Sequence, residues 1–365
     1  MSRPIPTEDR FSVLPDPILS YSQRDGTNYI WLSVLTLYFE DKTFQNFTFF
    51  CDFVPFVFLS RDITLPLQSF HLNCSKASGL HSHDIDQFVY AAAQRGRIES
   101  INLEIAIRVN FNLPPLNDLS QVVVNFPLLK TLHLSCLRFK RVKDLLNLLL
   151  GCPVLEELKA ESLQINNSRW ILSQGKFVLR EKMQSLPRFI RANITKIMPR
   201  HLMFLITWFC MEEAQVLRVE LDAKLCCNYH WPKINNLTNM ELILKHNHCE
   251  KWKWLLEILE CCPKLLNLTI HEDHRNAEEV VYNWIDPIIV PKCLSTQLRT
   301  CLLNDHKSST ESGLQFAKYI MQNSKVLNTM TIKSTSSRNR KAKYQMLLKL
   351  ASLPRASTTC KFVFD

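Results

Sequence analysis

The chain has 365 residues, of which 46% are hydrophobic and 21% charged, so its composition is that of a folded protein and excludes an intrinsically disordered one. The 44 lysines and arginines outnumber the 34 aspartates and glutamates. The formal net charge is therefore +10, which suits an acidic partner, a nucleic acid or an ordinary basic surface. Only six glycines are present and neither GxxxxGK[ST] nor GxGxxG occurs, which argues against a phosphate-binding loop.

The N-terminal sequence predicts neither export nor insertion into a membrane. MSRPIPTEDRF lacks the apolar run of a signal peptide. The apolar stretch 44–59 is interrupted by Asp52 and Pro55 and is too short to span a bilayer. Thirteen cysteines in a chain without a secretory signal are typical of reduced thiols. We therefore expect a cytoplasmic or nuclear protein without a membrane partner.

One short helix is predicted near the N-terminus, within DRFSVLPDPIL at residues 9–19. The next eleven residues, 20–30, are predicted not to form a second helix. They include Gly26 and the polar run SQRDGTN, both of which disfavour a helix. A helix of this length would in any case span only roughly 16 Å.

From residue 67 onward, the frame apolar-x-x-apolar-x-apolar recurs ten times. The ten segments begin at residues 67, 98, 129, 155, 189, 216, 237, 265, 298 and 327. Their spacing of 21 to 34 residues is irregular, but it is centred near the range of roughly 20–29 residues that is typical of leucine-rich repeats.

If each segment is a strand of a parallel sheet, the last two apolar positions of the frame face the core and the residues around them face solvent. Of the thirty positions expected on the solvated face, only Ile243 and Leu302 are hydrophobic. The ten segments are therefore predicted to form a sheet with one polar, open face. Its central repeats carry the charged residues Glu157, Lys159, Arg191, Arg218, Glu220 and Asp222.

Helical patterns lie between the predicted strands at 83–95, 140–152, 199–210, 250–262 and 312–324, each with apolar residues at helical spacing. Strands alternating with helices on one side predict an α/β fold, a leucine-rich-repeat solenoid. In this fold a curved parallel sheet has its helices on the convex face.

Three local features refine this prediction. Cys-Pro at 152–153 and at 262–263 should end the preceding helices. In WKWLLEIL, only one of Trp252 and Trp254 is expected to face the core. The C-terminal residues 343–365 supply a helix, a stop at proline and an alternating strand that would cap the open edge of the sheet.

Three stretches give the chain a resemblance to the plant F-box/FBD/LRR-repeat proteins over nearly its whole length. DRFSVLPDPIL is similar to the opening of an F-box, and LLLGCPVLEELKAESL at 148–163 is similar to that family's repeat signature. The most specific stretch, 290–365, resembles an FBD region from VPKCLSTQLRTCLL to LPRASTTCKFVFD. The resemblance implies an incomplete F-box-like segment at 1–35, leucine-rich repeats at 36–289 and an FBD region at 290–365 that caps the solenoid.

The resemblance implies the substrate-recognition subunit of an SCF-type ubiquitin ligase. The F-box docks on a Skp-family adaptor, here through Leu14, Pro15, Ile18 and Leu19, and the repeats hold the protein to be ubiquitylated. Such a subunit does no chemistry and acts by raising effective concentration. This chain departs from the family pattern, because the second helix and the Trp-rich end of the F-box are missing apart from Trp31. Half an interface should bind the adaptor weakly.

Other kinds of site are less well supported by the residues. A zinc site would draw on Cys226, Cys227, His230, His246, His248 and Cys249, but their spacing does not match paired C-x-x-C ligands. Neither GxSxG nor a recognisable cysteine nucleophile occurs. The basic run STSSRNRKAK at 334–343 has no interleaved aromatics for stacking on bases. We expect no metal, no cofactor, no catalysis and no nucleic-acid partner.

Two functions remain open. In the first, the chain binds an unknown target protein through Glu157, Lys159, Arg191, Arg218, Glu220 and Asp222 and delivers it to a ligase, since mixed charges suit a specific polar interface. In the second, the same solenoid is a scaffold or competitor that does not dock on the Skp-family adaptor.

Overall fold

The structure is a computed structural model, and it divides into two compact units, Met1–Leu155 with Ser162–Leu186, and Glu156–Glu161 with Pro187–Asp365. It describes residues 34–44, 46–61, 64–74, 82–94, 97–111, 125–167, 189–197, 213–222, 231–245, 251–273, 286–287, 289–305, 311–334, 347–348 and 351–364. The four predicted adaptor-docking residues, most of the basic run at 334–343, the helical pattern at 199–210 and the six cysteines and histidines weighed as zinc ligands lie outside these ranges.

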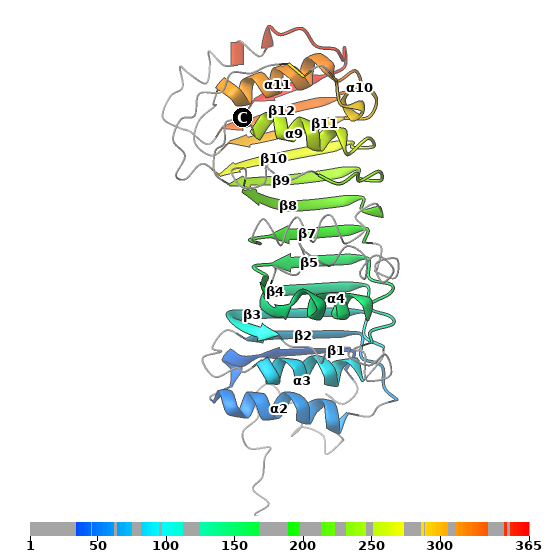
Figure 1. The fold of residues 1–365 in the computed structure, drawn as a ribbon, viewed down its shortest axis with the longest axis vertical. Coiled ribbons are helices and arrows are strands. Elements are labelled where there is room, and N and C mark those ends of the chain that lie inside the picture. The colour runs from blue at the N-terminus through cyan, green and yellow to red at the C-terminus, as the bar shows by residue number, and fades with distance from the viewer. Residues whose placement is uncertain are drawn as a thin grey trace, which may run out of the picture. The chain divides into compact units, whose positions relative to one another are not determined.

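The first unit is an α/β arrangement with a parallel sheet in which β1, β2, β3 and β4 follow one another in chain order (Figure 1). Its strands are β1 (Thr36–Glu40), β2 (Ser69–Cys74), β3 (Ser100–Phe111), β4 (Thr131–Arg141) and the short β6 (Gln164–Asn167), which pairs with the end of β4. Its helices are the 3-10 turn η2 (Asp41–Thr43), α2 (Phe47–Ser60), α3 (Ser82–Ala93) and α4 (Val142–Leu150). Helices α3 and α4 contact β3 and β4, respectively.

The second unit is also α/β, with a parallel sheet in the order β5-β7-β8-β9-β10-β11-β12-β13 (Figure 1). Its strands are β5 (Glu157–Glu161), β7 (Arg191–Thr195), β8 (Val216–Asp222), β9 (Asn239–Lys245), β10 (Asn267–Asp273), β11 (Thr300–Asp305), β12 (Thr329–Ser334) and β13 (Lys361–Phe364). Its described helices are α9 (Lys251–Glu260), α10 (Lys292–Thr296) and α11 (Glu311–Asn323), which contact one another on one side of the sheet.

All ten segments predicted from the repeated frame are strands of these two sheets. The predicted C-terminal strand is also present, because β13 pairs in parallel with β12. Two strands were not predicted. The first, β1, carries the same frame at Val34, Leu37 and Phe39, but the prediction divided this segment at residue 35. The second, β6, is only four residues long.

A repeated hydrogen-bond arrangement sets the register at the start of most described strands. In the first unit the backbone N–H groups of Lys130 and Thr131 both donate to the carbonyl of Glu99, at 2.8 and 3.0 Å. In the second unit Arg299 and Thr300 donate in the same way to Leu266, at 2.8 and 3.1 Å. This recurrence indicates that the repeats share one local geometry, although their connections differ in length.

Alternation along the strands produces one buried and one accessible face in each sheet. On β9, Leu242 is buried and its neighbour Glu241 is accessible. On β10, Leu268 is buried and its neighbour Thr269 is accessible. Each buried leucine contributes roughly 1.5–3 kcal/mol, so the row of core residues can hold the strands together. Ser135 was predicted on the accessible face and is instead buried, because the backbone bends at the next residue.

That bend recurs at one position in three repeats. Cys136, Ser162 and Lys196 have φ angles of 58, 54 and 54°, and each lies five residues after the first residue of β4, β5 or β7. A left-handed conformation costs a residue other than glycine roughly 1–2 kcal/mol. A buried apolar residue follows each of the three: Leu137, Leu163 and Ile197. The bend therefore returns the chain to the core and adds an apolar position that the six-residue frame did not include.

The Cys-Pro signals end their helices as predicted. Helix α4 ends at Leu150 and α9 at Glu260, each two residues before the cysteine of the Cys-Pro pair. The backbone N–H of Leu155 donates to the carbonyl of Cys152, and that of Leu265 donates in the same way to Cys262, both at 3.2 Å. These tight turns lead directly into β5 and β10.

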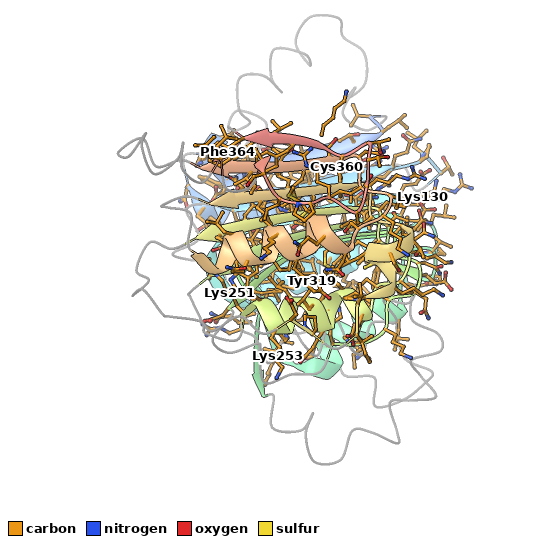
Figure 2. The ribbon with its side chains drawn as sticks, turned by 90° about the horizontal axis from the view of Figure 1, so that it is seen from above. Lys130, Lys251, Lys253, Tyr319, Cys360 and Phe364 are labelled. Atoms are coloured by element: carbon orange, nitrogen blue, oxygen red, sulfur yellow. The ribbon has the colours of Figure 1, made fainter. Side chains whose placement is uncertain are left out.

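The helix-covered side of the second unit has an aromatic core that includes a buried ion pair. Trp252 stacks on Phe316 with ring centroids 4.6 Å apart. The Nζ of Lys251 lies 2.8 Å from Glu272 Oε2 and 4.8 Å from the centroid of the Trp252 ring. Figure 2 shows Lys251 and Lys253 on α9, of which Lys251 is buried and Lys253 is exposed.

The expectation that only one of the two tryptophans of α9 faces the core was wrong. Trp254 is buried as well as Trp252, because it packs edge-on against Trp231, which precedes β9, at 6.1 Å between centroids. Within the described part of the chain, no helix is long and apolar enough to cross a bilayer.

Candidate binding face

The six charged residues predicted to bind a target lie on three neighbouring strands of the second unit. Glu157 and Lys159 are on β5, Arg191 is on β7, and Arg218, Glu220 and Asp222 are on β8. All six occupy the accessible positions of the alternating pattern, on the side of the sheet away from the core. We call this side of β5 and β7 to β13 the open face.

The strand register places several of these side chains in one row across the open face. Lys159 lies beside Asn193, Asn193 beside Arg218, and Arg218 beside Glu241. In the row before it, Glu157 lies beside Arg191. Neighbouring positions on one face of a sheet lie close enough for their side chains to interact.

Two of the six predicted residues are held in ion pairs within the sheet. Arg218 Nε lies 3.3 Å from Glu241 Oε1, and Lys245 Nζ lies 2.5 Å from Glu220 Oε1. The Glu220 side chain is only 11% exposed, so its carboxylate is largely occupied by this lysine. These pairs connect β8 to β9 and leave less of their charge available to a partner.

The ion pair of Arg218 continues into a polar network on β10 and β11. Nε2 of His271 lies 3.0 Å from the same Oε1 atom of Glu241. The other ring nitrogen of His271, Nδ1, lies 3.1 Å from the amide nitrogen of Asn304. The network thus joins one side chain from each of four consecutive strands, β8 to β11.

A second polar chain runs along the row at the start of the strands. Thr300 Oγ1 donates to Asn267 Oδ1 at 2.7 Å, Asn267 donates to Asn239 at 2.6 Å, and Asn239 donates to Thr238 Oγ1 at 2.9 Å. The Thr238 hydroxyl in turn donates to the carbonyl of Gln215 at 3.0 Å. Because these groups satisfy one another, they stabilise the sheet more than they offer contacts to a partner.

The charges on β5 and β7 are arranged differently. Within the described residues, Glu157, Lys159 and Arg191 take part in no ion pair or side-chain hydrogen bond. Asn193, which lies between Lys159 and Arg218, has a buried Oδ1 atom without a hydrogen-bond partner. The nearby Glu161 and Lys196 do pair, at 2.6 Å. This part of the open face therefore has polar groups that remain unsatisfied by the protein itself.

The accessible sheet face of the first unit carries fewer charges and more aromatic and polar rings. Tyr38, His71, Asn102 and His133 occupy one row across β1 to β4. Tyr38 and His71 lie 6.1 Å apart between ring centroids, and Tyr38 is 60% exposed. This face differs from the open face of the second unit in the chemistry that it presents.

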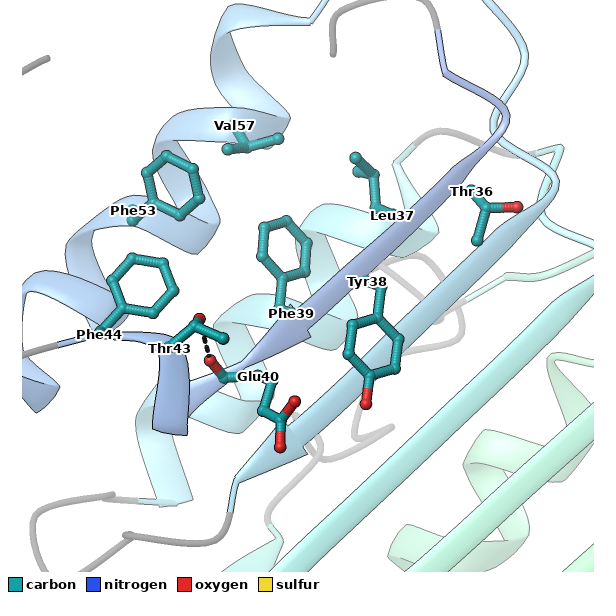
Figure 3. A pocket seen from close by; sticks show the side chains of 9 residues that line it. All are labelled: Thr36, Leu37, Tyr38, Phe39, Glu40, Thr43, Phe44, Phe53 and Val57. Atoms are coloured by element: carbon teal, nitrogen blue, oxygen red, sulfur yellow. Dashed lines mark hydrogen bonds between the residues drawn. The ribbon is translucent and has the colours of Figure 1, made fainter. Parts of the chain in front are cut away.

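A cavity of about 180 Å³ lies between β1 and α2 on the core side of the first unit (Figure 3). Leu37 and Phe39 point into it from β1, and Phe44, Phe53 and Val57 face them. Ligand pockets usually measure roughly 300–1,000 Å³ and carry convergent polar groups. This small aromatic recess is therefore better described as imperfect packing than as a ligand site.

Burial makes several thiols of the described residues poor nucleophiles and poor metal ligands. Burial raises the pKa of Cys293 and of Cys301 to about 12. Desolvation raises the pKa of the Cys152 and Cys262 thiols as well. No group of three or more His, Cys, Asp or Glu side chains suited to hold a metal ion is found in the part of the chain that the structure describes.

Sequence reasoning identified the charges on β5, β7 and β8 but not the residues that neutralise some of them. Glu241, Lys245 and His271 were not proposed as site residues. Glu241 pairs with Arg218 and His271, and Lys245 pairs with Glu220. The repeated frame did not give this pairing, because it aligns Glu241 with Glu220, whereas the strand register places Glu241 beside Arg218.

Comparison with known proteins shows which proteins this chain is similar to. The family model described as FBD matches residues 286–332, which include α10, β11 and α11 and reach into β12. An FBD-associated F-box protein of Arabidopsis thaliana is 27% identical over 89% of this chain and 88% of its own length. A second such protein from the same plant is 24% identical over 99% of this chain and 93% of its own length.

A third relative from Arabidopsis thaliana is described as an F-box/FBD/LRR-repeat protein, and it is 26% identical over 73% of this chain and 65% of its own length. Its description names leucine-rich repeats, and the parallel, regularly registered strands of this chain are compatible with such repeats. The chain is thus similar over most of its length to plant proteins described as FBD-associated F-box or F-box/FBD/LRR-repeat proteins, and its residues 286–332 match the FBD family model.

Proposed function

We propose that the chain is the target-recognition subunit of an SCF-type ubiquitin ligase and that it binds its target protein through the open face of a leucine-rich-repeat solenoid. The observation that carries this proposal is the open face itself, on which the strands present charged and amide side chains while their other side is buried. Repeat proteins commonly use such extended surfaces for binding. The names of the relatives, which combine F-box, FBD and LRR, support the same role.

The proposal assigns a function to each part of the chain. Residues 1–35 would dock on a Skp-family adaptor with Leu14, Pro15, Ile18 and Leu19, residues 36–289 would form the repeats, and residues 290–365 would continue and cap them. The chain would carry out no reaction itself. It would act by holding a target near the ubiquitin carrier, which raises the effective concentration of the reacting groups.

Co-expression with a Skp-family adaptor tests the ligase part of the proposal. We expect the two proteins to co-purify. Replacement of Leu14 and Ile18 with Asp should abolish the co-purification, because burying an unpaired carboxylate in an apolar contact is costly. A wild-type chain that never co-purifies with the adaptor would instead support a scaffold or competitor that holds targets without delivering them.

Charge reversal on the open face tests the recognition part separately. The variants replace Glu157, Lys159, Arg191, Arg218, Glu220 and Asp222 one at a time by residues of opposite charge. The proteins captured by each variant from plant extract are then compared by quantitative mass spectrometry. At least one reversal should remove proteins that the wild type captures. An unchanged set of captured proteins for all six variants would contradict binding through this face.

A further inference from the structure

We propose that Lys159, Arg191 and Arg218 form a binding site for an acidic segment of the target protein, in which aspartate or glutamate carboxylates pair with the three cations. We call these three residues the cationic triad. This inference rests on the proposed function, since it names the chemistry of the partner that the open face would hold.

The triad is arranged around a single residue, Asn193, on β7. Lys159 on β5 and Arg218 on β8 are the register neighbours of Asn193 on its two sides. Arg191 lies two residues earlier on the same strand and therefore projects from the same face. Three cationic side chains thus surround one position of the open face and can converge on one acidic group or on two adjacent ones.

The cations of the triad are only partly neutralised by acidic residues within the described part of the chain. Lys159 and Arg191 take part in no ion pair within the described residues, and Arg218 is engaged only through Nε, 3.3 Å from Glu241. The acids nearby are committed elsewhere, since Lys196 holds Glu161 and Lys245 holds Glu220. Glu157 lies beside Arg191 without an ion pair and offsets only part of the positive charge.

A peptide suits this site better than a nucleic acid. An acidic segment brings carboxylates for the three cations and backbone N–H donors for an acceptor such as the Glu157 carboxylate, which lies beside Arg191 without an ion pair among the described residues. The phosphates of a nucleic acid bring only acceptors. The register neighbours of Asn193 also include no aromatic side chain on which a base could stack.

Selection from a random peptide library tests the inference directly. The full-length chain, the double variant K159E/R191E and the control variant K253E are each immobilised and used for selection. Lys253 is exposed on α9, on the side of the second unit away from the open face, so its reversal changes the charge without touching the triad. Circular dichroism establishes that all three proteins are folded, as expected for substitutions at accessible positions.

The expected result is that the wild type and K253E enrich peptides with two or more Asp or Glu residues, and that K159E/R191E does not. Replacing two such acids with Asn and Gln in a fluorescein-labelled selected peptide should weaken its binding by roughly two- to thirtyfold, because exposed ion pairs contribute roughly 0.2–1 kcal/mol each. Binding should also weaken as salt is added.

Three outcomes would overturn the inference. In the first, K159E/R191E enriches acidic peptides as strongly as the wild type does. In the second, the wild type selects no acidic peptides. In the third, oligothymidylate displaces the labelled peptide at a lower concentration than the unlabelled peptide does. None of these depends on adaptor docking or on which captured proteins respond to reversals of the other charges. Failure of the acidic-segment site is therefore distinguishable from failure of the proposed function.

Discussion

The two sides of the second unit's sheet hold similar ion pairs in opposite surroundings. Lys251 and Glu272 lie on the helix-covered side with side chains only 1% and 7% exposed, whereas Arg218 and Glu241 on the open face are 46% and 36% exposed. Removing one partner of a buried pair leaves a charge without compensation in a medium of low dielectric constant, while water and salt screen an exposed pair. The pair on the covered side is thus tied to folding, whereas the pair on the open face contributes little to stability.

The largest effect that sharpens this comparison is expected at the buried pair. Lys251→Met should lower the free energy of unfolding by about 3–5 kcal/mol, because Glu272 loses its lysine partner while it stays buried. Urea denaturation measures the change. Lys253→Met on the same helix is the matched control and should stay within about 0.5 kcal/mol of the wild type, because Lys253 is exposed. Equal effects of the two substitutions would show that burial of the pair is unimportant.

Adjacent residues of one strand provide the second test. Leu268 on β10 is buried and Thr269 beside it is accessible. Leu268→Ala should destabilise the protein by about 2–5 kcal/mol through lost contacts and a cavity, whereas Thr269→Ala should change stability by less than about 0.5 kcal/mol. Thermal and urea unfolding measure the stability of the two variants. If Thr269→Ala destabilised the protein as much as Leu268→Ala, the assignment of the two faces would be contradicted.

The buried thiols predict a dependence of stability on pH that belongs to the covered side. The pKa of Cys293 is raised from 9.0 to about 12 by burial, so the unfolded thiol loses its proton at a pH at which the folded one keeps it. The free energy of unfolding should therefore be unaffected by this group below about pH 9 and should fall above it. At pH 10.5 Cys293 alone should account for about 2 kcal/mol. In Cys293→Ala the loss of stability between pH 8 and pH 10.5 should be smaller by that amount, and an identical loss would refute the assignment.

The repeated backbone bend predicts a smaller, stabilising effect. Ser162 has a φ angle of 54°, which glycine adopts without steric cost. Ser162→Gly should raise the free energy of unfolding by up to about 1 kcal/mol, because the relief of strain exceeds the added freedom of the unfolded chain. Ser162→Ala keeps the steric cost and should bring no such gain. A stabilisation by alanine as large as that by glycine would point to loss of the hydroxyl instead.

The smallest effect is expected at the exposed pair of the open face. A double-mutant cycle with Arg218→Ala and Glu241→Ala should give a coupling energy of about 0.2–1 kcal/mol that decreases with added salt. The two variants and their combination are compared by urea denaturation at low and high ionic strength. A coupling energy of several kcal/mol would show that the exposed pair stabilises the protein as much as a buried pair. The distinction between the two sides of the sheet would then not hold.

The sequence was sufficient to locate ten of the strands because each of these carries a signal that depends on its own residues. Two apolar positions alternate with polar ones in all ten segments, and this local pattern corresponds to burial on one side of a sheet. The bend at Cys136, Ser162 and Lys196 was not predictable in the same way, because none of the three is glycine. The sign of this bend in the sequence is the apolar residue that directly follows each of the three. It is recognised only when the repeats are aligned by the first residues of their strands.

The site was only partly predictable because pairing depends on residues far apart in the sequence. That Arg218 and Glu220 face solvent follows from their own strand, but their neutralisation depends on Glu241 and Lys245 in the next repeat. The burial of both Trp252 and Trp254 likewise depends on Phe316 and Trp231, which come from other repeats. Patterns within one segment assign a side chain to a face, whereas its partners depend on how neighbouring segments are aligned.

The paired N–H groups that bond to one carbonyl at most strand starts have a consequence for how such proteins diversify. Because these strands are each aligned by the preceding one, a connection of unusual length does not shift the strands that follow. The remaining strands can therefore stay in place when a connection gains or loses residues. They can also stay in place when a complete strand is duplicated with its connection. Duplication or loss of a complete strand with its connection therefore changes which side chains stand next to each other on the open face, while the backbone geometry of the remaining strands stays the same.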